Sequence, residues 1–227
     1  MLLRSIAVLA AANLMNNKVA PRLGPLTSTA ATAALVAMAR KSGLSWEELG
    51  FEHGRRGAIA GGALAAAVAT VYTVGISHPR TRPLFHDERA LSLSRARVLE
   101  EALLQVPLGT VLLEEVGFRG ALYAMLRQRH GTVAATAVSS TLFGLWHILP
   151  AMDMARANPA LGALTAGESP NHLDMARVVA GSVVSTAAAG VLFCELRRHN
   201  GLLAPAMLHL ATNSLGYLFA RIAAKKK

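Results

Sequence analysis

The chain has 227 residues, of which 53% are hydrophobic, and it carries a formal net charge of +10 at pH 7. A composition this apolar is unusual for a soluble globular domain and indicates that the lipid bilayer is the solvent. The excess of lysine and arginine does not favour nucleic-acid binding, because these residues lie between apolar segments and not along one amphipathic face. Basic residues that flank apolar segments are typical of membrane topology. We therefore expect an integral membrane protein that binds no nucleic acid.

The apolar segments predict a bundle of membrane helices. Two short candidates come first, at residues 5–17 and 23–39. Four uncharged stretches approach the roughly 17–25 residues that span a hydrocarbon core, and they cover residues 57–77, 132–152, 178–194 and 201–220. A further long helix, residues 98–129, carries charges in its middle. Because lipid cannot hydrogen-bond an exposed backbone, we expect an all-α, multi-pass bundle of about seven transmembrane helices with an intramembrane polar cavity.

Two polar stretches interrupt this pattern. Residues 78–97 contain two prolines and several charges, and residues 153–177 are rich in loop-forming types, so both are predicted to be connectors. The chain then divides into N-terminal transmembrane helices (1–77), a polar connector (78–97) and a core of membrane helices (98–223). Residues 43–50 predict a short interfacial helix, capped by Ser45 with Glu48 three positions further on.

Three ionisable residues, Glu114, Glu115 and Arg119, lie inside the long apolar helix. Each charge at a bilayer centre costs about 2.5–3.5 kcal/mol, so these side chains should face protein or water. On an α-helix, Glu115 and Arg119 are about 40° apart around the axis, whereas Glu114 and Arg119 are about 140° apart. We expect Glu115 to pair with Arg119 and Glu114 to point elsewhere, free for general acid–base chemistry.

Two later helices add further polar side chains. His147 follows Phe143 by one turn on the same face, and imidazole is the usual proton shuttle near neutral pH. His209 and Asn213 are also four residues apart, so both can address one point inside the bundle and donate to a developing oxyanion. Each feature alone has a structural explanation, such as an ion pair or an interhelical hydrogen bond. Their joint presence on three successive membrane helices favours a functional site.

The motifs E-E-x-x-x-R, F-x-x-x-H and H-x-x-x-N, in this order, resemble the three signature motifs of the CAAX-protease and bacteriocin-processing family. The resemblance covers residues 90–220, the part of the chain that contains the predicted core. It implies an intramembrane endopeptidase of a bacterial-type cell membrane, which acts on peptide or membrane-protein substrates and needs no cofactor.

The resemblance also implies a role for each matched residue. Glu114 and His147 would activate a water molecule, and His209 and Asn213 would stabilise the oxyanion. The supporting residues Glu115, Arg119 and Phe143 would brace the site.

Two other functions stay open on the residues alone. The carboxylate and two imidazoles suit a zinc-dependent membrane metallopeptidase, although the sequence has no H-E-x-x-H motif and we do not favour zinc. A non-catalytic peptide-binding or immunity protein would use the same polar cavity without cutting.

Several small residues are interpreted as packing surface between helices. Ser139 and Ser140 lie near His147, but they are not part of a G-x-S-x-G motif, which would indicate a nucleophilic serine. We assign both to packing, and we assign Gly181, Ser182 and Ser185 to packing as well.

Overall fold

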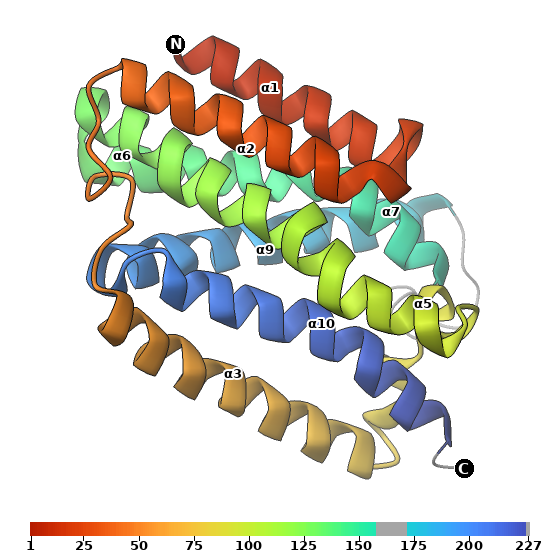
Figure 1. Cartoon of the computed structure of the whole chain (residues 1–227). Coiled ribbons are helices and arrows are strands. Elements are labelled where there is room, and N and C mark those ends of the chain that lie inside the picture. The colour runs from red at the N-terminus through yellow and green to blue at the C-terminus, as the bar shows by residue number, and fades with distance from the viewer. Residues whose placement is uncertain (158–171, 226–227) are drawn as a thin grey trace.

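The computed structural model describes residues 1–157 and 172–225. These described residues form helices and turns without a strand, which confirms the prediction of an all-α membrane bundle. Three helical stretches are long and apolar enough to cross a membrane, namely Gly54–Ser77, Arg95–Arg156 and Met175–Asn200. The long segments pack side by side in one bundle (Figure 1).

Seven longer helical segments follow one another in the described part of the chain. The first three are α1 (Leu2–Leu14), α2 (Gly24–Lys41) and α3 (Gly54–Ser77). The fourth runs without interruption through α5 (Arg95–Glu100), η4 (Glu101–Val111), η5 (Leu113–Leu122) and the first part of α6 (Tyr123–Trp146). The fifth comprises the rest of α6 with α7 (Ile148–Ala157), and the last two are α9 (His172–Asn200) and α10 (Leu203–Lys225).

Short helical turns occupy the connections. They are η1 (Met15–Val19), η2 (Pro21–Leu23), η3 (Arg82–Phe85) and α4 (Glu88–Leu91).

Inside α6 the helix breaks at Gly131, whose φ of 78° and ψ of 176° are readily adopted only by glycine. The stretch 132–152, expected as one span, divides at His147 into α6 and α7.

The N-terminal helices cover two sides of the helices that carry the motifs. In Figure 1, α1 and α2 lie along one side of the bundle, and α3 lies on the opposite side next to α10. Helix α2 packs on η4 and η5, and α3 packs on α10. The second contact is close because of Gly61: a Cβ atom there would lie 2.8 Å from the Cβ of Met207. The division of the chain into three parts, at residues 77 and 97, stays a prediction.

Both η4 and η5 are π-helical, with backbone hydrogen bonds from residue i to i+5. Such turns are rare and frequently occur at functional sites. A π-helix has more residues per turn than an α-helix, so neighbouring side chains diverge less in direction around the axis. Glu114 and Glu115, both in η5, consequently face more nearly the same way than α-helical geometry predicts.

The segment 43–50 is a hydrogen-bonded turn and not the regular helix expected from its sequence. The predicted capping pair is nevertheless present. The amide of Ser45 donates to Glu48 Oε2 at 2.7 Å, and the amide of Glu48 donates to Ser45 Oγ at 3.0 Å. Hydrogen bonding to Ser45, above all to its backbone amide, holds the pKa of the Glu48 carboxyl below its ordinary value.

Part of the predicted loop 153–177 is helical. Helix α7 continues to Ala157, because this segment contains good helix formers and an Asp153–Arg156 pair one turn apart, with 3.2 Å between the charged atoms. Residues 158–171 lie outside the described residues, and α9 begins at His172.

The packing of α6 on α9 uses only some of the small residues expected: Ser139 and Ser140 are buried, and Ser140 faces α9. Gly181 and Ser185 are exposed, so assigning them to packing was wrong. Contact is made instead by Gly144, where a Cβ atom would lie 2.6 Å from the carbonyl oxygen of Val183, and by Gly190, which faces Ser140. The helical period explains the difference, because residues 183, 187 and 190 share one face of α9 while residues 181 and 185 lie on the other.

Candidate active site

The Glu114 carboxylate lies in a buried polar cluster formed by η5, α6 and α10. Its Oε1 accepts a hydrogen bond from Trp146 Nε1 at 2.8 Å. Its Oε2 lies 3.7 Å from His147 Nε2 and 3.6 Å from His209 Nε2. This second oxygen is buried and has no hydrogen-bond partner within the described residues. Since an unpartnered buried acceptor costs free energy, Oε2 is suited to accept a hydrogen bond from a water molecule or from a polar group of a substrate.

The two histidines differ in what their Nδ1 atoms contact. His147 Nδ1 lies 2.8 Å from the carbonyl oxygen of Phe143. That carbonyl is available because the His147 amide donates to Gly144 instead. A carbonyl can only accept, so His147 Nδ1 carries a hydrogen, and Nε2 is the ring nitrogen that faces Glu114. His209 Nδ1 lies 2.7 Å from Glu115 Oε1, so its neighbour is a carboxylate.

Arg119 joins the second carboxylate to the aromatic side chains. It is fully buried, its Nη1 lies 3.6 Å from Glu115 Oε1, and the same nitrogen donates to the Glu114 carbonyl at 3.2 Å. Its guanidinium carbon lies 3.7 Å from the centroid of the Phe143 ring, close enough for a cation–π interaction. The expected pairing of Glu115 with Arg119 is therefore present.

The Glu114 carboxylate turns away from Arg119, as expected, and makes its contacts with Trp146, His147 and His209. Glu114 and Glu115 both reach the same imidazole, that of His209. The π-helical winding of η5 helps both carboxylates to reach this ring, because neighbouring side chains lie closer in direction there than on an α-helix.

Phe143 lies at the centre of the aromatic packing around the cluster. It is 2% exposed, and its ring centroid lies 4.5 Å from His147 and 6.1 Å from His209. Asn213 follows His209 by one turn on the same face of α10 and is half-buried. The structure thus brings six of the seven predicted residues into one contact network, with Asn213 one turn further along the helix.

Sequence reasoning missed Trp146, Asn13 and Phe193. Trp146 bonds directly to Glu114, and Asn13 donates to the Trp146 carbonyl at 2.8 Å. The ring of Phe193 on α9 lies 5.3 Å from that of His209. One signal was available in the sequence, because a buried indole N–H usually finds a hydrogen-bond acceptor.

A groove of about 360 Å³ lies beside Trp146, between α1 and the α6–α7 turn. It is lined mainly by apolar side chains: Ile6, Leu9, Ala10, Asn13, Leu14, Phe118, Leu142, Leu145, Trp146, Ile148 and Leu149. Because Trp146 also bonds to Glu114, the groove and the polar cluster share one side chain.

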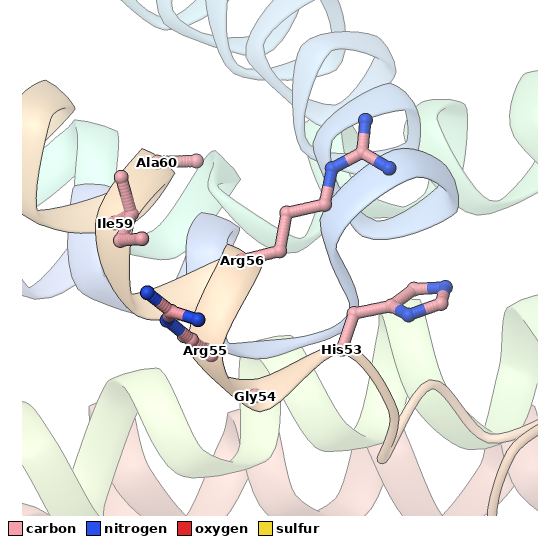
Figure 2. A pocket seen from close by; sticks show the side chains of 6 residues that line it. All are labelled: His53, Gly54, Arg55, Arg56, Ile59 and Ala60. Carbon is pink, nitrogen blue, oxygen red and sulfur yellow. The ribbon is translucent and has the colours of Figure 1, made fainter.

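A second hollow, of about 660 Å³, lies at the start of α3. Figure 2 shows that its polar side chains, His53, Arg55 and Arg56, point in different directions. They do not converge on one ligand position. In the part of the chain that the structure describes, no group of three or more His, Cys, Asp or Glu residues is arranged to hold a metal ion.

Fold and site together define a helical membrane protein with a buried carboxylate–imidazole cluster. A family model described as type II CAAX prenyl endopeptidase Rce1-like matches residues 101–215, slightly more than half of the chain. The matched range includes all seven motif residues between Glu114 and Asn213. No curated protein and no solved structure matches the chain. The chain belongs to the Rce1-like family of CAAX prenyl endopeptidases and is a membrane endopeptidase, as its motifs predicted.

Proposed function

We propose that this endopeptidase works by a glutamic-type mechanism, in which Glu114 and His147 activate a water molecule. The observation that supports it best is Glu114 Oε2, a buried oxygen without a partner within the described residues. It lies 3.7 Å and 3.6 Å from the two imidazole Nε2 atoms. A water molecule among these three atoms would have the two to four polar partners that a buried water needs.

In the proposed reaction, the water oxygen attacks the carbonyl carbon of the scissile peptide bond. One water proton passes to the base formed by Glu114 and His147, and the carbonyl oxygen takes the negative charge. When the carbon–nitrogen bond breaks, the same base returns that proton to the leaving nitrogen. The products are one new carboxyl group and one new amine, so atoms and charge balance.

The surroundings of the histidines support a division of roles. His147 faces a neutral carbonyl through Nδ1, which leaves a lone pair on Nε2 to accept a proton. His209 faces the Glu115 carboxylate, which can neutralise a positively charged ring that donates from both nitrogens. A charged His209, with Asn213 one turn away, would stabilise the oxyanion. Arg119 and Phe143 hold these groups in place.

The substrate class follows from the family and the groove. Members of the matched family cleave CAAX proteins, and the apolar groove beside Trp146 suits a hydrophobic part of a peptide or membrane-protein substrate. We propose that this part lies in the groove while the scissile bond reaches Glu114. Family membership favours this enzyme over a non-catalytic peptide-binding or immunity protein.

The test compares the wild type with Glu114→Gln, which keeps the shape of the side chain but removes its charge. Both are expressed at matched levels, and protein termini in the membrane fraction are sequenced. We expect new termini with the wild type only. Glu100→Gln, the same change on the same continuous helix at a half-exposed position, is the matched control and should behave as the wild type.

Two results would redirect the proposal. Full proteolytic activity of Glu114→Gln would eliminate the glutamic mechanism. Activity that is lost to a chelator and restored by zinc would establish the metallopeptidase instead.

A further inference from the structure

Trp146 connects the Glu114 carboxylate to the N-terminal helix, through its indole on one side and its backbone carbonyl on the other. Its Nε1 donates to Glu114 Oε1 at 2.8 Å, and its backbone carbonyl accepts from Asn13 Nδ2 at 2.8 Å. Trp146 is 8% exposed and Asn13 is 9% exposed, so water competes little for the donors and acceptors of these two hydrogen bonds. The ring of Phe118 packs edge-on against the indole, with 5.4 Å between centroids.

The hydrogen bond from Trp146 limits the rotation of the Glu114 carboxylate. With Oε1 fixed to the indole, the carboxylate must direct Oε2 toward His147 and His209. Without it, the carboxylate could turn about its last bond and lose that alignment. Small errors in the position of a reacting group lower reaction rates strongly.

The hydrogen bond from Asn13 meets a specific need at the end of α6. Trp146 is the last residue of this helix. The residue four positions later is Pro150, which has no N–H to donate to the Trp146 carbonyl. An unsatisfied carbonyl in an apolar environment is costly, and the amide of Asn13 supplies the missing donor. Asn13 lies on α1, outside the family-matched range 101–215.

We propose that Trp146 is a positioning residue that aims the Glu114 carboxylate at the two histidines, and that Asn13 holds Trp146 in this place. This inference rests on the proposed function, because it assumes that Glu114 acts as the base. It gives the N-terminal helix a part in the chemistry that the family motifs do not contain.

The kinetic test uses Trp146→Phe, which keeps an aromatic ring but removes the N–H. Loss of a hydrogen bond to a charged group should lower kcat about tenfold to a hundredfold, while KM changes less than about twofold because the groove keeps an aromatic wall. Trp146→His, which retains a ring N–H, should recover part of the lost kcat. A normal kcat for Trp146→Phe would overturn the inference.

Asn13 is tested by Asn13→Asp, which keeps the shape and removes the donor. We expect kcat to fall severalfold. Asn16→Asp is the matched control, since Asn16 on the next turn donates to Ser28 at 2.8 Å and not to the cluster. Equal kcat values for the two variants would overturn the role of Asn13. Thermal unfolding of both shows whether either has lost its fold.

A spectroscopic test needs no turnover. The chain has two tryptophans, and Trp46 is exposed, so Trp46→Phe leaves Trp146 as the remaining tryptophan. In this background, Glu114→Ala should shift the tryptophan emission maximum, whereas Glu100→Ala should not. Unchanged emission would show that the Trp146–Glu114 contact is absent, whatever the enzyme's mechanism.

The emission shift also separates failure of the inference from failure of the proposed function. If Glu114→Gln cleaves normally but Glu114→Ala shifts the emission, the contact exists and the glutamic mechanism is wrong. If Glu114→Gln is inactive but Trp146→Phe is normal, the mechanism stands and the positioning role is wrong.

Discussion

The charged residues of the cluster differ mainly in which group each one faces. Glu114 meets an indole and two imidazoles, whereas Glu115 meets an imidazole and a guanidinium. Identical side chains next to each other in the sequence therefore have different surroundings. A bracing role for Glu115 and Arg119 agrees with their burial, since both are at most 1% exposed.

Replacing Arg119 should cost stability as well as activity. Arg119→Met leaves Glu115 without its cation in a buried environment, and breaking a buried ion pair in this way costs about 3–5 kcal/mol. We expect a clearly lower Tm in detergent micelles, measured by circular dichroism. Arg127→Met, on the same continuous helix but at an exposed position, should change the Tm little. Equal Tm values for the two variants would contradict a structural role for Arg119.

At the scale of the helices, the position of the cluster depends on how closely α6 approaches α9. Gly144 allows this approach, because a Cβ atom at this position would lie 2.6 Å from the Val183 carbonyl oxygen and 2.9 Å from the Ala187 Cβ. Gly144 is also flanked by Phe143 and lies three residues before His147. A change in the separation of the two helices must therefore move the site.

Gly144→Ala should separate α6 from α9. We expect overpacking to cost about 1–3 kcal/mol and to lower kcat, because His147 moves relative to Glu114. Gly181→Ala on α9 is the matched control, since no atom lies within 4 Å of a Cβ atom there. Thermal unfolding and peptidase assays of both variants test this, and a stable, fully active Gly144→Ala would refute the close contact.

Helix α1 supplies one wall of the apolar groove, so filling the groove from this helix should obstruct the substrate. Ala10 lines the groove and is otherwise exposed. Ala10→Leu should raise KM with little change in Tm, because the added atoms occupy the groove and not the core. Ala11→Leu places the same side chain on the next, exposed residue, which does not line the groove. An equal KM for the two variants would show that substrate binds elsewhere.

At the scale of the whole molecule, Cys194 offers a measure of unfolding. It is the only cysteine in the chain and is fully buried on α9, with its sulfur 3.9 Å from Ser140 Oγ. We expect N-ethylmaleimide to leave the folded protein unlabelled and to react when the helices separate. Mass spectrometry of samples heated in detergent measures this, and Gly144→Ala should be labelled at a lower temperature than the wild type. Rapid labelling of the native wild type would contradict the buried position.

Much of this architecture could be predicted from apolar length and polar spacing. The segments 57–77 and 178–194 lie within α3 and α9, since long uncharged stretches have few alternatives to a helix in lipid. The motif residues could be found because charged groups inside a membrane helix need a partner. The sequence did not indicate that Glu114 and Glu115 both reach His209, because η5 is π-helical and α-helical angles place the two side chains further apart.

The hydrogen bond between Asn13 and Trp146 could not be predicted, because it joins residues 133 positions apart in the sequence. Nothing in local periodicity specifies which helix lies beside the end of α6. The missing donor at Pro150 indicates that the Trp146 carbonyl needs a partner, but it does not indicate that the partner is on α1.

Several polar atoms of the cluster have no partner within the described residues: Glu114 Oε2, Glu115 Oε2, Arg119 Nε and Arg119 Nη2. A ligand that offers hydrogen bonds to these buried atoms gains partners that the protein itself does not supply, so binding and folding are coupled at the cluster. A peptide-like inhibitor that supplies hydrogen bonds to these atoms would stabilise the folded form, by about 2.7 kcal/mol at one hundred times its Kd. A rise in Tm would thus reveal ligands for this enzyme without a cleavage assay.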